Sequence, residues 1–105
     1  GYVIHFDFYP GRGLSLARLR ASETSIRLRN GGEVIQPHAL APRRKLKNLL
    51  QEHGIPPWQR NRFPLLYCGE ELVCVPGIAI SPHFLAEPAE PGVQVSLERL
   101  MRQAV

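Results

Sequence analysis

The chain has 105 residues, of which 44% are hydrophobic, so it is long enough for one domain with a modest core and too short for two. Its net charge of +4 is concentrated in residues 43–64, where six lysines and arginines accompany one glutamate, whereas residues 63–105 are net acidic. A basic patch of this kind suits a polyanionic partner. No apolar run approaches the length of a membrane span and no signal peptide opens the chain, so we expect a cytoplasmic protein without a membrane partner.

The first twenty residues predict a strand followed by a short helical turn. Residues 2–8 are rich in aromatic and β-branched side chains, and apolar residues at positions 4, 6 and 8 alternate with polar ones. This pattern predicts a half-buried strand that ends at Pro10-Gly11. Residues 15–20 predict a single turn of helix.

A second strand and a tight turn are predicted next. Residues 24–29 alternate between apolar and polar side chains, which predicts a strand with Ile26 and Leu28 inward and both arginines facing solvent. Asn30-Gly31-Gly32 is typical of a turn, and its glycines would also let a backbone or a phosphate approach closely. Residues 34–42 are expected to form a loop that leads to the basic segment.

The basic segment predicts a helix with one apolar stripe. Leu46, Leu49, Leu50 and His53 recur at helical spacing, and Gly54 is a stop signal. The cations Arg43, Arg44 and Lys45 would then lie in the first turn, where the helix dipole prefers anions and each cation costs roughly 0.3–1 kcal/mol. A bound phosphate would relieve this repulsion, so we expect an anion site there. The alternative is an ordinary solvated helix face.

A second short helix is expected to follow. Pro57 is suited to the first position of that helix, which holds Trp58 near a sharp corner with Arg60 and Arg62 after it. Trp58 is interpreted either as a core or lid residue over the first helix or as a stacking platform for a terminal base.

The last third of the chain predicts a hairpin, a connecting segment and a terminal helix. Residues 65–68 and 72–75 predict two strands joined by a glycine-containing turn. The proline-rich residues 81–91 are expected to be a linker, and Ser96 would cap a helix over residues 97–103. These elements together predict a single α+β domain with antiparallel strands and hairpins and two short helices packed on one side.

The chain contains no catalytic or metal-binding motif that we recognise. Cys68 and Cys74 are spaced neither as a redox pair nor as a zinc knuckle, and they are interpreted as reduced core thiols. The four histidines are scattered singly, and no phosphate loop or nucleophile elbow is present. We therefore expect no catalytic residue, no metal and no cofactor in this chain.

Several runs of residues occur in an order that is specific as a combination: Arg27-Leu28-Arg29-Asn30-Gly31-Gly32-Glu33, Leu46-Lys47-Asn48-Leu49-Leu50-Gln51-Glu52, Gly54-Ile55-Pro56-Pro57-Trp58-Gln59-Arg60-Asn61-Arg62, Pro64-Leu65-Leu66 and Val75-Pro76-Gly77. This combination resembles the C-terminal domain of tRNA(Ile)-lysidine synthetase over about residues 11–80, and residues 81–105 lie outside the resemblance. Family members use ATP and free lysine in a separate N-terminal domain to modify the wobble cytidine of isoleucine tRNA. The chain begins Gly1-Tyr2 without a methionine, and we expect it to be a piece of such a longer ligase.

The resemblance implies a noncatalytic domain that binds the acceptor end of isoleucine tRNA and adjoins its own N-terminal catalytic domain. RNA-binding roles for Arg29, Lys47, Trp58, Arg60 and Arg62 are implied by matching motif positions. Arg43, Arg44 and Lys45 are nominated on electrostatics alone. One rival interpretation is an architectural domain whose basic patch docks on the catalytic domain without touching RNA. The other is a free-standing enzyme. The sequence makes no prediction of oligomeric state.

Overall fold

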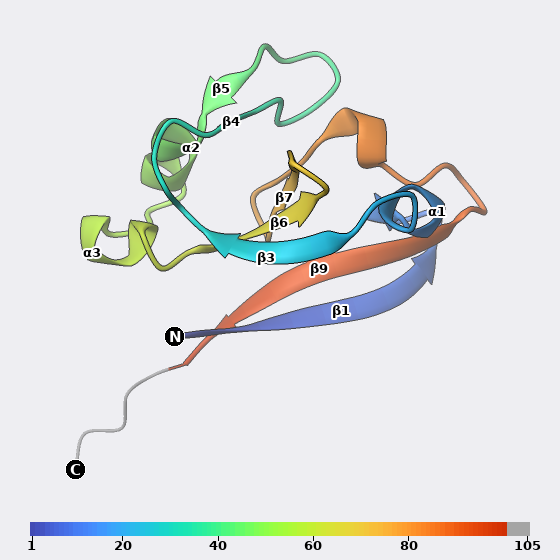
Figure 1. Ribbon diagram of the computed structural model, residues 1–105, viewed down its shortest axis with the longest axis horizontal. Coiled ribbons are helices and arrows are strands. Elements are labelled where there is room, and N and C mark those ends of the chain that lie inside the picture. Colours follow the sequence, from blue (N-terminus) through green and yellow to red (C-terminus); the bar gives the residue numbers. More distant parts are fainter. Residues whose placement is uncertain (101–105) are drawn as a thin grey trace.

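The computed structural model describes residues 1–100 and contains three antiparallel sheets with short helices (Figure 1). The predicted fold class, small and α+β with antiparallel pairing, is confirmed. The elements follow the chain in this order: β1 Tyr2–Pro10, β2 Leu14–Ser15, α1 Leu16–Leu19, β3 Thr24–Leu28, β4 Val34–Ile35, β5 Arg44–Lys45, α2 Leu46–Glu52, α3 Pro57–Arg60, β6 Pro64–Cys68, β7 Glu71–Val75, β8 Ala79–Ile80, the 3₁₀ turn η1 Pro82–Phe84 and β9 Pro91–Arg99.

The two longest strands come from opposite ends of the described chain and pair with each other. β1 runs antiparallel to β9 in one continuous register, from Tyr2 opposite Arg99 to Pro10 opposite Pro91. The expected helix over residues 97–103 with Ser96 as its cap is therefore wrong, because positions 96–99 belong to β9, and positions 101–103 lie outside the described residues. The apolar residues of this segment recur at every second position, which suits a strand better than a helix.

Close backbone packing places β2 against β9. A Cβ on Gly13 would lie 2.2 Å from the carbonyl oxygen of Val93, so only glycine fits where the chain crosses the strand. Ser15 then caps α1, its Oγ accepting a hydrogen bond from the backbone N–H of Arg18 at 3.3 Å. The predicted helical turn in residues 15–20 is confirmed.

The central sheet has the strand order β3-β6-β7-β8, and its β6–β7 hairpin is the one that the sequence predicts. The expected orientation of β3 is wrong, because Ile26 and Leu28 are 45% and 60% exposed. Arg27 instead lies on the covered face, with its guanidinium carbon 4.5 Å from the centroid of the Tyr67 ring. The hairpin turn explains this orientation, since Arg27 donates hydrogen bonds to the carboxylate of Glu70.

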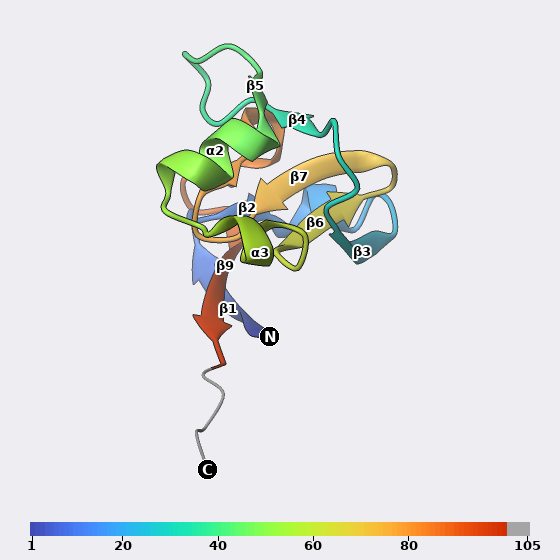
Figure 2. The ribbon, with the colours of Figure 1, turned by 90° about the vertical axis from the view of Figure 1, so that its left-hand side faces the viewer.

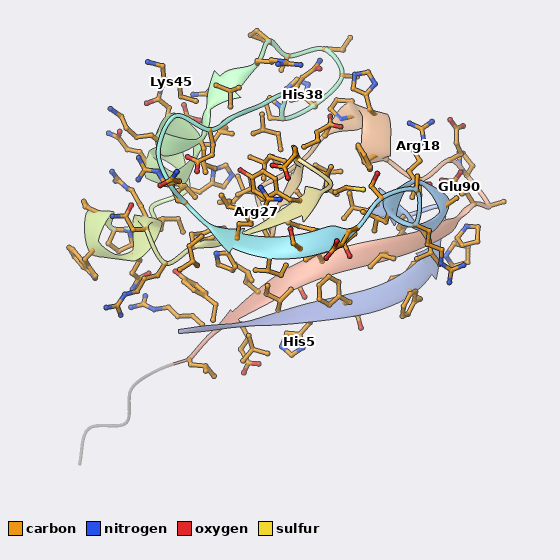
Figure 3. The ribbon with its side chains drawn as sticks, viewed as in Figure 1. His5, Arg18, Arg27, His38, Lys45 and Glu90 are labelled. Atoms are coloured by element: carbon orange, nitrogen blue, oxygen red, sulfur yellow. The ribbon has the colours of Figure 1, made fainter. Side chains whose placement is uncertain are left out.

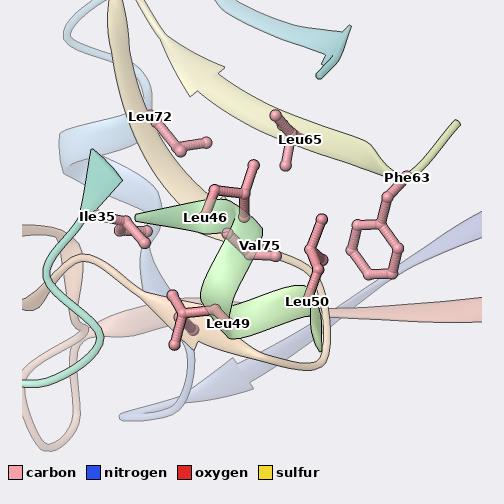
Figure 4. Packing of buried hydrophobic residues seen from close by; sticks show 9 residues of the cluster. Ile35, Leu46, Leu49, Leu50, Phe63, Leu65, Leu72 and Val75 are labelled. Atoms are coloured by element: carbon pink, nitrogen blue, oxygen red, sulfur yellow. The ribbon is translucent and has the colours of Figure 1, made fainter. Parts of the chain in front are cut away.

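The apolar stripe of α2 packs into the larger of two core clusters (Figure 4). Leu46, Leu49 and Leu50 are buried as predicted, whereas His53 is exposed and does not continue the stripe. The partners of the stripe come from β4, β6, β7 and the segment before β6; they include Ile35, Phe63, Leu65, Leu72 and Val75. The helix is thus fixed by burial, and its opposite face remains in solvent.

The second cluster lies between β2, α1, the central sheet and β9, and it contains both cysteines. Cys68 and Cys74 are buried free thiols, as the sequence predicts. Burial raises the pKa of the Cys74 thiol to about 12. None of the helices in residues 1–100 is long and apolar enough to cross a membrane.

Candidate nucleic-acid interface

The cations before α2 occupy a strand and a loop rather than a helical turn. Arg44 and Lys45 form β5, which pairs with Val34–Ile35 of β4, and α2 begins only at Leu46. The expectation that Arg43, Arg44 and Lys45 lie in the first helical turn is therefore wrong. The sheet pairing keeps the backbone of Lys45 extended, with φ −66° and ψ 131°.

The start of α2 differs in its details from the sequence-based expectation. The first N–H of the helix, that of Leu46, already donates to the carbonyl oxygen of Glu33 at 2.9 Å. The helix has seven residues and no side-chain cap. Arg43 and Arg44 lie before the helix, so only Lys45, the N-cap residue, and Lys47, the second residue of α2, remain near the positive end of the helix dipole.

Three of the nominated cations do meet at one place. Arg29, Lys45 and Lys47 line an open cavity of about 250 Å³ together with Gly32, Glu33 and Val34. Lys45 and Lys47 are exposed, and Figure 3 shows the Lys45 side chain reaching outward from β5. The β4–β5 pairing brings these side chains together, because it sets the turn after β3 beside the start of α2.

The carboxylate of Glu33, the acidic residue of this cavity, is hydrogen-bonded within the turn that precedes it. The Glu33 carboxylate accepts hydrogen bonds from the backbone N–H groups of Asn30, at 2.6 Å, and Gly31, at 3.0 Å. The predicted turn is confirmed, since Gly31 and Gly32 have φ values of 102° and 81°. Open space surrounds both glycines, so their role in the fold is conformational. Arg29 is positioned by Asn61, whose Oδ1 lies 3.4 Å from the Arg29 guanidinium.

Arg43 and Arg44 do not line this cavity. Arg44 forms an ion pair with Glu52 at the end of α2, and this hydrogen-bonded contact lowers the pKa of the Glu52 carboxyl. Arg43 lines a different cavity, of about 220 Å³, in company with Glu70 and Glu71. Neither arginine adds its charge to the cavity of Arg29, Lys45 and Lys47.

The remaining nominated residues belong to α3 and the turn after it. Trp58 is 75% exposed, so the interpretation of this residue as a core or lid side chain is wrong. Arg60 is partly buried, and its Nε donates to the carbonyl oxygen of Ile55 at 2.9 Å, whereas Arg62 is exposed. As predicted, Pro57 occupies the start of α3. α2 and α3 lie side by side at one end of the molecule and face the viewer in Figure 2.

Sequence reasoning missed the two residues that shape the cationic cavity, Glu33 and Asn61. Glu33 acts through hydrogen bonds within its own turn, whereas Asn61 reaches Arg29 from 32 residues further along the chain. In the sequence, only the position of these two residues within the family motifs could have indicated that they matter. Within residues 1–100, no three His, Cys, Asp or Glu side chains converge where they could hold a metal ion.

Comparison with known proteins gives consistent matches. A family model described as the TilS substrate C-terminal domain matches residues 24–97. The tRNA(Ile)-lysidine synthase of Nitrosomonas europaea is 42% identical over 94 residues, which cover 90% of this chain and 20% of that protein. The synthase of Coxiella burnetii is 41% identical over 80 residues, which cover 76% of this chain and 18% of that protein.

A solved structure gives the same fold. It is described as the crystal structure of a TilS C-terminal domain, and it superposes with a TM-score of 0.72 at 21% identity. The match covers 97% of this chain and 87% of the other. The chain spans about one fifth of the length of the curated relatives named above.

Proposed function

This chain belongs to the family of TilS substrate C-terminal domains, and from that premise we propose that it is a noncatalytic RNA-binding domain that grips the acceptor end of isoleucine tRNA. The observation that carries the proposal is the convergence of Arg29, Lys45 and Lys47 on one open cavity. None of the ion pairs in the described part of the chain uses these three residues. Their charges are therefore available to an external anion.

Backbone phosphates are the ligands that this surface suits best. Lysine and arginine side chains that contact phosphates supply most of the affinity for nucleic acid and position the protein without reading sequence. The cavity is open to solvent and is lined by Val34 of β4, Lys45 of β5 and Lys47 of α2, which leaves room for an RNA strand to pass over it. Arg62, which is also exposed, extends the basic surface towards α3.

Trp58 adds a means of recognising an unpaired base. An exposed indole on a short helix offers a flat apolar surface that costs little to dehydrate, and bases of any sequence stack on such surfaces. The acceptor end of a tRNA finishes in unpaired nucleotides, whereas its stem is A-form and presents mainly phosphates and 2′-hydroxyls. In this proposal the cations contact the acceptor stem, and Trp58 stacks on a base of the unpaired end.

The chemistry of lysidine formation is assigned to another part of the protein. The matched relatives are named tRNA(Ile)-lysidine synthase, and this chain corresponds to about one fifth of their length. ATP and lysine would be bound by a separate catalytic domain, and this domain would hold the tRNA while the wobble cytidine is modified.

The decisive experiment measures binding of the chain to a full isoleucine tRNA as a function of salt. The Lys45→Gln/Lys47→Gln double variant should weaken binding and flatten the log–log salt slope by about 1.5, since each phosphate contact contributes about 0.7–0.9. The matched control is Arg12→Gln/Arg20→Gln, which removes two exposed charges near α1, at the other end of the molecule. It should leave the slope nearly unchanged.

Two outcomes would contradict the proposal. One is equal flattening by both double variants, which would mean that the RNA senses net charge alone. The other is the absence of tRNA binding by a folded chain that binds the catalytic domain instead, which would favour the rival architectural role.

A further inference from the structure

The long strand β1 has one edge that is paired with no strand in the described part of the chain. Among residues 1–100, β9 is the only strand that pairs with β1, and Figure 1 shows the other edge of β1 facing away from the rest of the molecule. The β1–β9 register runs through nine residues without a bulge. The backbone N–H and C=O groups on the outer edge therefore form a regular row that is ready to pair.

β1 lacks the features that usually protect such an edge. Natural edge strands are kept from pairing by lysines, prolines, bulges or short length. β1 has one formally charged residue, Asp7, and its single proline is the last residue of the strand. Its apolar side chains are also open to solvent, because Phe6 is 48% exposed and Phe8 is 71% exposed. The expected half-buried strand is therefore only partly correct, because residues 2–4 are partly buried whereas Phe6 and Phe8 are exposed.

The sequence of β1 is complementary to itself about Phe6. Facing residues of two paired strands must point to the same side of the sheet. In a symmetric antiparallel pair of identical strands, the two-fold axis therefore passes midway between one residue and its own copy. Centred on Phe6, this arrangement pairs all nine residues. It sets Ile4 opposite the copy of Phe8, and it sets His5, which already contacts Glu98 of β9 at 3.0 Å, opposite the copy of Asp7.

Neighbouring registers are worse. A pair centred on Asp7 would place two carboxylates directly opposite each other, which is destabilising. A pair centred on His5 would place Asp7 opposite Val3 and leave two residues of each strand unpaired. The register about Phe6 is therefore favoured because it keeps the two Asp7 carboxylates apart and gives the longest overlap.

The apolar side of this pair would also be continuous. Phe6 and Phe8 line an open apolar cavity of about 530 Å³ together with Leu19 of α1 and Ile26 of β3. In the register about Phe6, the two Phe6 rings meet at the axis and each Phe8 lies beside Ile4 of the other copy. Aromatic and apolar cross-strand pairs of this kind stabilise antiparallel sheets.

We propose that the occupant of the β1 edge is a second copy of this chain, paired antiparallel through β1 in the register centred on Phe6. The two three-stranded sheets then form one continuous sheet across the two-fold axis. A single pair of strands buries less than the roughly 800 Å² per partner of a standard interface, so the dimer is weak and depends on concentration.

The first test is sedimentation equilibrium of the chain from about 10 µM to about 1 mM, the range in which a complex with a small interface dissociates. The parent chain should show a monomer–dimer equilibrium. Phe6→Lys should raise the dissociation constant at least tenfold, because two ammonium groups would face each other at the axis. Leu28→Lys is the matched control: it adds the same charge at a 60% exposed apolar site on another edge strand, β3, and should not change the association. Circular dichroism establishes that each variant is folded.

The second test fixes the register by disulfide formation. Directly opposite residues lie about 4.5–5.5 Å apart between Cα atoms, within reach of a disulfide, whereas diagonal neighbours at about 7–8 Å are too far. Phe6→Cys should therefore cross-link with itself under mild oxidation. His5→Cys and Asp7→Cys should each remain uncross-linked alone and should cross-link when mixed. Cys68 and Cys74 are buried and form the common background.

The proposal fails if the parent chain is monomeric throughout the concentration range. It also fails if Phe6→Lys, while folded, associates like the parent, or if Phe6→Cys cross-links no faster than Leu28→Cys. These results do not depend on RNA binding, so they leave the proposed function untouched.

Discussion

Arg44 on β5 and Glu52 at the end of α2 form an ion pair that joins the strand before the helix to the last residue of the helix. One guanidinium nitrogen of Arg44 lies 2.8 Å from Glu52 Oε2, and a second contacts Oε1. The carboxylate of Glu52 therefore balances the charge of Arg44. The basic segment, uniform in sequence, is thus divided in the structure between the ion-paired Arg44 and the lysines that line the cavity with Arg29.

The first prediction compares Arg44 with Lys47. Lys47→Gln should flatten the salt slope of RNA binding by about 0.7–0.9, the contribution of one phosphate contact. Arg44→Gln should flatten it by much less, because its charge is already balanced by Glu52. The measurement is the affinity for isoleucine tRNA at several salt concentrations. A larger effect at Arg44 than at Lys47 would show that the ion pair opens when RNA binds.

The second prediction concerns the pH dependence of stability. Because Arg44 lowers the pKa of Glu52 below its ordinary value of 4.5, the pair stabilises the folded state at pH values above about 4.5. This stabilisation is lost as the pH falls through the lowered pKa. The parent chain should therefore unfold at a higher temperature than Glu52→Gln at pH 7, and the difference should vanish in acid. A difference that persists after both proteins are acidified would contradict the role of the ion pair.

The third prediction concerns the exposed indole of α3. Trp58→Ala should weaken binding to isoleucine tRNA by about 1–3 kcal/mol without changing the salt slope, since stacking on a base releases few ions. Trp58→Phe should restore part of the affinity because it keeps an aromatic face. The loss should shrink for a tRNA that lacks its unpaired 3′ nucleotides. An equal loss for both RNAs would place Trp58 elsewhere than at the unpaired end.

The fourth prediction concerns the apolar stripe that holds α2. Leu49 is buried in the core cluster, so Leu49→Ala should lower the free energy of unfolding by about 2–5 kcal/mol. Leu40 is 95% exposed, and Leu40→Ala serves as the control that should leave stability unchanged. Chemical denaturation of the two variants gives the comparison. An unchanged midpoint for Leu49→Ala would contradict the packing seen in Figure 4.

The sequence by itself determined the elements whose cause is local. The leucine spacing of α2, the proline at the start of α3 and the glycine turn between β6 and β7 each act through neighbours in the chain, and all three predictions are confirmed. The prediction that the two cysteines are reduced core thiols likewise needed only their spacing and the usual burial of cysteine. The family motifs could also be recognised from the sequence, because they are defined by the order of residues along the chain.

Tertiary structure alone decided which side chains face solvent and which cations lie together. Ile26 and Leu28 are exposed because Arg27 finds Tyr67 and Glu70 on the other face, and those partners lie about forty residues away along the chain. Lys45 joins Arg29 at one cavity because β5 pairs with β4, whereas Arg44 turns to Glu52. Strand pairing and ion pairing over long separations have no local signature, because their energy depends on distances that exist only after the chain has folded.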